Sequence, residues 1–321
     1  MENSKSFSQQ LAWDISHSSL VDEFKKSTLQ LRLHELEDQA LNIMVVGPKG
    51  VGKTSTIKAV FGNRLNEEFN AVSGITRFQN GNLVVWDYPG HNGDEQHDKM
   101  LDMQIGATLS ESDSDGNPLI DMAVVVLDPA EQNLNQGYRL ICDVIAPALG
   151  SNFDNRLVVG LNKVDIASFS YEWDFLNDSP SNEVEIWPES TAALIRHCML
   201  DESGLEIAPV CYAADFERTN GEGRRPFNTI KLLNQIVAKL PAAKQITLID
   251  TPLNQQSQAW FDSDDRMNYV VEVENSLFDS IYQGSRGGSR FGGLLGAYMG
   301  KQGREIGYLI RRNLHNRLNL A

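Results

Sequence analysis

One stretch, Ile43–Ser55 (IMVVGPKGVGKTS), constrains the fold of this chain more than any other. It begins with apolar residues typical of a buried strand, and the next eight residues match G-x-x-x-x-G-K-[S/T]. The residues after the motif can continue as a helix. In such a strand–loop–helix context, glycines let backbone N–H groups face phosphate oxygens, and the helix N-terminus adds a favourable dipole. The stretch therefore predicts a loop that binds the phosphates of a nucleoside triphosphate.

The residues of this loop have separate expected roles. Lys53 is expected to reach the β- and γ-phosphates, and the Thr54 hydroxyl to bind Mg²⁺. The residues expected around the nucleotide are Gly47, Pro48, Lys49, Gly50, Val51, Gly52, Lys53, Thr54 and Ser55.

Composition limits the class of protein. The 321 residues, 41% of them hydrophobic, allow one large domain with appendages or two domains. The net charge of −15 argues against an overall nucleic-acid-binding surface. Three widely spaced cysteines with apolar neighbours indicate buried thiols in a reducing compartment. The polar N-terminus does not resemble a signal peptide, and no apolar run approaches about 20 residues. We therefore expect neither a secreted protein nor a membrane-spanning helix.

Strand patterns alternate with helix patterns, which predicts an α/β fold with helices on both faces of a mostly parallel, six-stranded sheet. We expect a helical lead over residues 1–40, a nucleotide-binding domain over 41–241 and a helical, Gly-rich, basic extension over 242–321. Local expectations are a polar loop over Gly62–Ile75, a hairpin at Asn80-Gly81, a helix over Leu140–Ala146 that ends or kinks at Pro147, a last strand over Ile207–Cys211 at a sheet edge, and a helix capped by Asn228.

A second motif follows the loop. Asp87–Gly90 lies at the end of a predicted strand and has the D-x-x-G form. Asp87 is expected to support the Mg²⁺ shell, and the Gly90 N–H to contact the γ-phosphate. Thr76 lies between the two motifs, where a threonine can complete Mg²⁺ coordination when GTP is bound, although a plain loop residue is the alternative.

A third motif identifies the base. Asn162, Lys163 and Asp165 form N-K-x-D directly after a buried strand. The Asp165 carboxylate can accept hydrogen bonds from N1–H and the exocyclic amine of guanine, a donor pair that adenine lacks. The segment Tyr212-Ala213-Ala214 takes the place of a turn whose backbone N–H meets guanine O6, with a register uncertain by one residue.

These motifs, in this order, resemble the translation-factor-related GTPases over Leu41–Leu240. Within that class the chain is most similar to the Era-like (TrmE–Era–septin) branch, and especially to bacterial YfjP-like GTPases. The shared features are G-V-G-K, T-R at Thr76-Arg77, L-N-K-x-D, a Glu172-Trp173 pair and P-V-C at Pro209–Cys211. The resemblance implies a P-loop NTPase G domain in three layers. It also implies a cytoplasmic GTPase, and it leaves open ties to ribosomes, RNA or a peripheral membrane surface.

His91 departs from many Era-like sequences, which have an apolar residue after this glycine. Asp87–His91 instead resembles the D-C-P-G-H pattern of elongation factors. His91 either orients the attacking water, as Gln does in other GTPases, or lies exposed in a loop. The expected catalytic residues are thus Lys53, Thr76 and His91, and the expected Mg²⁺ ligands and supports are Thr54, Thr76 and Asp87.

The C-terminal segment 284–321 holds seven Lys or Arg against one Glu in an otherwise acidic chain. Ile306, Ile310, Leu314 and Leu318 lie four residues apart, as on one face of a helix. Such a basic amphipathic helix either docks on an anionic surface, lipid headgroups or ribosomal RNA, or folds back onto the protein's own acidic surface. Glycines every four residues from Gly284 to Gly300 either form a stripe for close helix packing, and so for homo-oligomers, or a flexible linker.

The sequence as a whole predicts a protein that binds GTP and GDP and hydrolyses GTP with Mg²⁺ as a molecular switch. The alternatives are an assembly or membrane-surface protein with little intrinsic turnover, and a ribosome- or RNA-associated GTPase.

Overall fold

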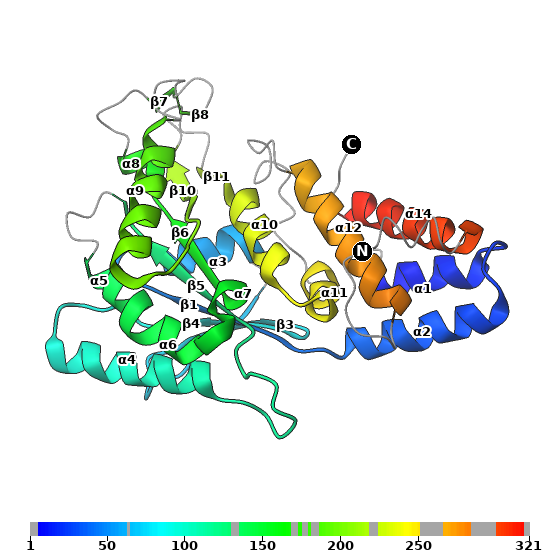
Figure 1. The fold of residues 1–321 in the computed structure, drawn as a ribbon, viewed down its shortest axis with the longest axis horizontal. Helices are drawn as coiled ribbons and strands as arrows, with labels where there is room; N and C mark the ends of the chain where they lie inside the picture. Colours follow the sequence, from blue (N-terminus) through cyan, green and yellow to red (C-terminus); the bar gives the residue numbers. More distant parts are fainter. Residues whose placement is uncertain are drawn as a thin grey trace.

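A computed structural model describes the chain over residues 6–62, 65–129, 135–167, 173–174, 179–180, 186–217, 224–250, 266–283 and 300–317. A sheet covered by helices on both sides forms one part of the molecule, and a bundle of helices from both ends of the chain forms the other (Figure 1). No helix within these ranges has both the length and the apolar character needed to cross a membrane.

The main sheet has the strand order β2-β3-β4-β1-β5-β6-β9. Its strands are β1 (Leu41–Val46), β2 (Asn66–Phe69), β3 (Thr76–Asn80), β4 (Leu83–Asp87), β5 (Met122–Leu127), β6 (Leu157–Leu161) and β9 (Val210–Cys211). From β4 to β9 neighbouring strands are parallel, whereas β2, β3 and β4 pair antiparallel. The predicted three-layer fold is confirmed, with one strand more than the six expected. The extra strand is β2, whose residues are all exposed and lack the apolar pattern that marks a strand.

Each central strand packs against helices on both faces, which explains its nearly continuous apolar sequence. In β1, Ile43 and Val45 enter one core, which includes α3 (Lys53–Phe61) and α10 (Thr229–Lys239). Met44 and Val46 enter the other core, against α4 (Glu95–Ser110) and α9 (Ile186–Ser203). Loops at the carboxyl ends of these strands therefore start from fixed positions.

Shorter elements complete this part. They are η2 (Gly150–Asn152), α7 (Phe153–Arg156), α8 (Val164–Ala167), the pair β7 (Trp173–Asp174) and β8 (Ser179–Pro180), and the pair β10 (Ala213–Glu217) and β11 (Arg224–Phe227). The predicted hairpin at Asn80-Gly81 joins β3 to β4, with Gly81 at φ 56°. Strand β9 is shorter than predicted and lies at the sheet edge as expected, with Pro209 just outside it.

Two local predictions agree with the structure only in part. The helix expected to end or kink at Pro147 continues past it, as α5 (Asn135–Arg139), the π-helix η1 (Leu140–Ile145) and α6 (Ala146–Leu149). The wide π-helical turn lies just before Pro147, whose missing N–H cannot serve an ordinary helical turn. Asn228 occupies the N-cap position of α10 as predicted, but it has φ 55° and its side chain makes no cap hydrogen bond.

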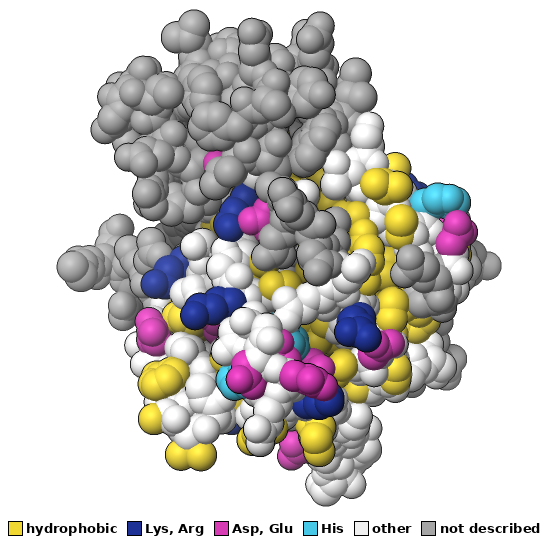
Figure 2. Space-filling model, turned by 90° about the vertical axis from the view of Figure 1, so that its left-hand side faces the viewer, with side chains coloured by type: hydrophobic (Ala, Val, Ile, Leu, Met, Phe, Trp, Pro, Cys, Tyr) yellow, Lys and Arg dark blue, Asp and Glu magenta, His cyan; other side chains and the backbone are white. Residues whose placement is uncertain are grey.

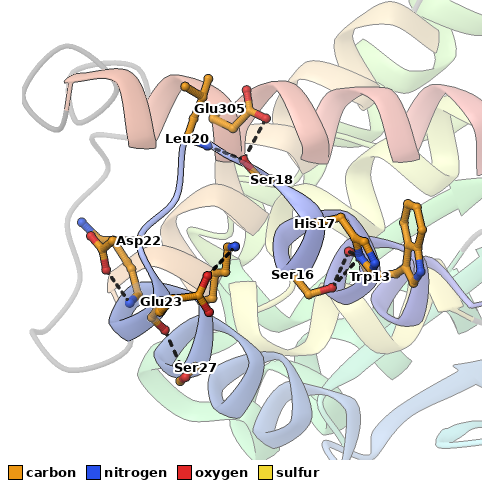
Figure 3. A network of polar contacts seen from close by, with 11 residues as sticks. Trp13, Ser16, His17, Ser18, Leu20, Asp22, Glu23, Ser27 and Glu305 are labelled. Atoms are coloured by element: carbon orange, nitrogen blue, oxygen red, sulfur yellow. Dashed lines mark hydrogen bonds and ion pairs between the residues drawn. The ribbon is translucent and has the colours of Figure 1, made fainter.

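The N-terminal and C-terminal segments form one helical bundle. Its helices are α1 (Phe7–His17), α2 (Glu23–Glu37), α11 (Ala242–Asp250), α12 (Arg266–Gln283) and α14 (Gly300–Arg317). Helix α14 lies against α1 and α12 (Figure 1). The link between α1 and α2 also contacts α14, where the Ser18 hydroxyl donates to Glu305 at 3.1 Å (Figure 3). The two ends of the chain thus support each other.

The apolar stripe predicted in the C-terminal segment is buried inside this bundle. Ile306, Ile310 and Leu314 are fully enclosed. The basic side chains beside them meet acidic residues of the same chain: Arg311 pairs with Glu274 and Arg312 with Asp14. Such contacts favour packing within the chain over docking on an anionic surface. The glycine-rich stretch 284–299 and Leu318 lie outside the described residues.

The face of the molecule that carries α4 mixes charges of both signs. Among its described side chains, basic and acidic groups lie interspersed with scattered apolar ones (Figure 2). The described side chains of this face therefore form no broad patch of one sign of the kind that would attract a polyanion.

Candidate functional site

The phosphate-binding loop joins β1 to α3 and adopts a backbone that only glycine tolerates at two key positions. Gly47 has φ 145°, and a side chain there would come within 2.2 Å of the Val126 carbonyl oxygen. Gly52 has φ 91°, and a side chain there would come within 2.3 Å of the Asn162 amide. The loop is thus held between β5 and the loop after β6, which explains its glycine spacing.

Lys53 begins α3 with a buried side chain, 8% exposed. Its ammonium group donates to the Gly47 and Pro48 carbonyl oxygens, both at 3.0 Å. Burial lowers the Lys53 pKa, and the nearby Asp87 carboxylate acts in the opposite direction. A buried cation at the start of a helix, wrapped by its own loop, is well placed to meet phosphate oxygens.

Asp87, at the end of β4, lies next to the loop. It accepts a short hydrogen bond from the Thr54 hydroxyl. Thr76 lies opposite Asp87 in the register of the antiparallel pair β3–β4. The other oxygen of Asp87, Oδ1, is buried and has no hydrogen-bond partner within the described part of the chain. Burial raises the Asp87 pKa, while the Thr54 hydroxyl and the Lys53 charge oppose that rise.

This oxygen-rich arrangement fits Mg²⁺. Two threonine hydroxyls and one carboxylate are hard oxygen donors of the kind that Mg²⁺ prefers beside phosphates. A bound cation would also give the buried Asp87 Oδ1 a partner. Without one, a buried polar oxygen raises the free energy of the folded state. Thr54, Thr76 and Asp87 therefore can hold or support the ion, as the sequence predicted for them.

These residues face one open cleft of about 370 Å³. Its walls come from the phosphate-binding loop, the strand β3 and the D-x-x-G turn, namely Gly50, Gly52, Lys53, Thr54, Ser55, Gly74, Thr76, Asp87, Tyr88, Pro89 and Gly90. The cleft thus brings together two of the three sequence motifs.

The third motif is joined to the first by Asn162. Its side-chain amide donates to the Val51 carbonyl at 2.8 Å and accepts from the Ala214 N–H at 2.8 Å. Lys163 has φ 63°, and its ammonium group contacts Asp128 at 2.8 Å. Asp165 lies in the first turn of α8 and is half-buried. Three loops at the same sheet edge are therefore fixed relative to one another.

The segment after β9 differs in detail from its predicted role. Tyr212 is fully buried, and its hydroxyl lies 2.7 Å from the Thr56 hydroxyl behind the phosphate-binding loop. Burial raises the Tyr212 pKa, so the phenol stays neutral. Ala213 is also buried, and the Ala214 N–H is already engaged by Asn162. In this arrangement the Ala214 N–H is not free to meet guanine O6.

His91 is neither exposed nor directed into the cleft. Only 5% of its surface is exposed, which rules out the alternative of an exposed loop residue. Its Nε2 lies 2.7 Å from Asp102 Oδ1 on α4, and its carbonyl oxygen accepts from the Lys49 N–H at 3.0 Å. The backbone at His91 therefore touches the phosphate-binding loop while the ring turns toward α4.

Two acidic residues of this region were not predicted. Asp128 follows the buried strand β5, as Asn162 follows β6, so its place at the carboxyl edge could have been inferred from that spacing. Asp102 has no such signal, because it lies in the middle of an ordinary amphipathic helix.

Comparisons with known proteins give similarity in fold alone. No protein-family model and no curated protein matches this chain. Among solved structures, it is similar to the LeoA bacterial dynamin GTPase from ETEC (15% identity, TM-score 0.46), covering 76% of this chain and 44% of that one. It is also similar to Toc33 from Arabidopsis thaliana in complex with Mg²⁺ and GMPPNP (14%, TM-score 0.42, 76% and 99% covered). A probable GTP-binding protein engB gives 16% identity and a TM-score of 0.38, with 62% and 97% covered. This chain thus spans less than half of the LeoA chain.

Proposed function

We propose that this protein binds GTP and hydrolyses it to GDP with Mg²⁺, as a molecular switch. The observation that carries the proposal is the double contact of Asn162, which joins the phosphate-binding loop at Val51 to the segment after β9 at Ala214. This contact fixes the predicted base-binding loop beside the predicted phosphate site.

In this proposal Lys53 binds the β- and γ-phosphates, and loop N–H groups bind the remaining phosphate oxygens. Thr54 and Thr76 would hold Mg²⁺, and Asp87 would support its shell. The ion would supply positive charge against the phosphates as negative charge moves toward the leaving group. Lys53 moves from the Gly47 and Pro48 carbonyls to the phosphates when nucleotide binds, so its burial is compensated by a stronger partner.

Guanine selection is assigned to Asp165. The residue follows Asn162 and Lys163, which are both held by hydrogen bonds at the sheet edge. A carboxylate placed there accepts from guanine but would stay unpaired against adenine. The Era-like assignment belongs to this proposal and rests on the motif spacing in the sequence.

Water positioning is assigned to His91, whose backbone already contacts the phosphate-binding loop at Lys49. Its ring must turn away from Asp102 to reach the cleft. Replacing His91 by Ala should leave GTP affinity unchanged and slow single-turnover hydrolysis by about ten-fold or more.

Binding titrations and single-turnover assays on the full chain test the function directly. We expect GTP and GDP to bind in the presence of Mg²⁺, ATP to bind far more weakly, and phosphate to be released from GTP. The Lys53→Ala variant should lose both binding and release. The proposal fails if ATP binds as well as GTP, or if bound GTP is never hydrolysed.

A further inference from the structure

We propose that Asp102 is a latch that holds His91 away from the phosphate cleft and thereby sets the resting rate of GTP hydrolysis. The inference rests on the proposed function and deepens it, because it assigns a regulatory role to a residue outside the three motifs. Asp102 is a positioning residue, since it acts through His91.

The hydrogen bonding of the His91 ring supports a closed latch. The carboxylate of Asp102 can only accept, so the His91 Nε2 must carry the proton in their 2.7 Å contact. In the neutral ring the other nitrogen, Nδ1, is then an acceptor. That Nδ1 atom is buried and has no partner within the described part of the chain. Neither nitrogen is therefore available to a water molecule in this conformation.

The cleft itself shows where the ring would have to go. Gly90 lines the cleft, whereas the adjacent His91 does not. The His91 carbonyl oxygen is bonded to the Lys49 N–H, so the backbone is already beside the phosphate-binding loop. In the open state that we infer, the His91 ring has turned toward the cleft and its contact with Asp102 is broken.

A second carboxylate on the same helix holds the backbone during such a rotation. Asp98 accepts from the Asn92 and Gly93 N–H groups at 3.0 and 3.1 Å. It is itself contacted by Gln136 at 3.1 Å. Asp98 and Asp102 are four residues apart and thus lie on one face of α4. Asp98 fixes the loop and Asp102 fixes the ring, so the latch opens by losing one side-chain hydrogen bond.

Single-turnover hydrolysis by full-length variants tests the latch. The Asp102→Ala variant should hydrolyse GTP about ten-fold faster or more, because a hydrogen bond to a charged group shifts an equilibrium by at least that order. Asp102→Asn keeps an acceptor without the charge and should give a smaller increase. GTP affinity should stay within about two-fold in both variants, since the side chain at position 102 does not line the cleft.

Two controls separate a latch from a structural role. The increase should vanish in the double variant His91→Ala/Asp102→Ala, because the latch acts only through His91. Glu95→Ala removes another carboxylate from α4, one that pairs with exposed Lys99, and should leave the rate unchanged. Nitrogen NMR of the His91 ring should show a protonated Nε2 in the parent protein and a mixture of tautomers in Asp102→Ala.

The outcomes distinguish the two proposals. If the parent protein hydrolyses GTP and Asp102→Ala is equally fast or slower, the latch is overturned and the proposed function stands. An increase that persists in the double variant also overturns the latch. Should Asp102→Ala fail to fold, the rate of Asp102→Asn decides in its place. If no protein in the series hydrolyses GTP, the proposed function fails and the latch fails with it.

Discussion

At the scale of single residues, the sequence predicts those side chains whose chemistry demands a fixed spacing. Lys53, Thr54 and Asp87 lie together in the cleft because the two loops that carry them start from neighbouring strands at one edge of the sheet. The orientation of His91 could not be predicted in this way. It depends on Asp102, a residue of α4 that no spacing rule connects to the motif.

Replacement of Asp165 by Asn should change the base that the protein selects. The amide offers a donor where guanine also presents donors, so affinity for GTP should fall by at least about ten-fold. Xanthosine triphosphate presents an acceptor at this edge and should bind in exchange. Competition titrations with both nucleotides measure the change. Unaltered GTP affinity in the variant would remove Asp165 from the base site.

Replacement of Asp87 by Asn should separate stability from function. Burial raises the pKa of Asp87 in the folded protein, so the folded state binds more protons than the unfolded state between the two pKa values. Stability contributed by this group therefore falls as pH rises through that interval. Without nucleotide, the Asn variant should be at least as stable as the parent at pH 7.

The same variant should lose about 10- to 100-fold in Mg²⁺-dependent GTP affinity, because Asp87 supports the ion. Thermal melts at pH 4.5 and 7, with Mg²⁺-dependent titrations, measure both effects. Asp115→Asn, in an exposed turn, is the matched control and should change neither quantity. A large loss of stability at pH 7 in Asp87→Asn would contradict the argument.

At the scale of elements, periodicity predicts what is buried on both sides and misses what is not. The apolar runs of β1 and β5 predict central strands because helices cover both faces of the sheet. Strand β2 is exposed along its length and three of its four residues are polar, so its pairing with β3 rather than an apolar pattern defines it. The π-helix η1 could not be predicted from the sequence either, since residues Leu140–Ile145 have the apolar pattern of an ordinary α-helix.

The contact between the D-x-x-G turn and the phosphate-binding loop leads to a test at this scale. A side chain at Gly90 would come within 2.5 Å of Lys49 backbone atoms. Gly90→Ala must therefore push the two loops apart, which should cost about 1–3 kcal/mol of stability and weaken both GTP and GDP. Gly106→Ala on α4 meets only Val144 at 3.7 Å and should be tolerated. Equal melting temperatures and affinities for both variants would argue against tight contact between the loops.

At the scale of the whole molecule, the two ends of the chain fold as one body. The sequence predicts a helical lead over residues 1–40 and a helical, basic extension over 242–321, but sequence patterns do not show which distant helices meet. The structure places α1 against α14 and couples them through buried Asp14, which contacts Arg312 and accepts from Asn313 at 3.0 Å. Burial by itself would raise the pKa of Asp14, but the hydrogen bonds from Asn313 and Arg312 outweigh this effect and lower the pKa below its ordinary value.

Removal of the chain from Gly284 onward should therefore destabilise the protein. The deletion takes away α14, in which Ile306, Leu309, Ile310 and Leu314 are buried, and burial of each such side chain contributes about 1.5–3 kcal/mol. It also exposes the apolar faces of α1 and α12, which favours aggregation. Arg311→Ala breaks only a half-exposed ion pair with Glu274 and should cost less than about 1 kcal/mol.

The measurement is a thermal melt of the truncated protein, of Arg311→Ala and of the full chain, together with cosedimentation of the full chain with anionic vesicles. We expect the melting temperature to fall clearly for the truncated protein and to stay nearly unchanged for Arg311→Ala. We expect the full-length protein to stay in the supernatant at moderate salt, because α14 already packs its apolar face inside the molecule. A truncated protein with an unchanged melting temperature, combined with full-length protein that sediments with the vesicles, would mean that α14 leaves the bundle to act as an anionic docking element.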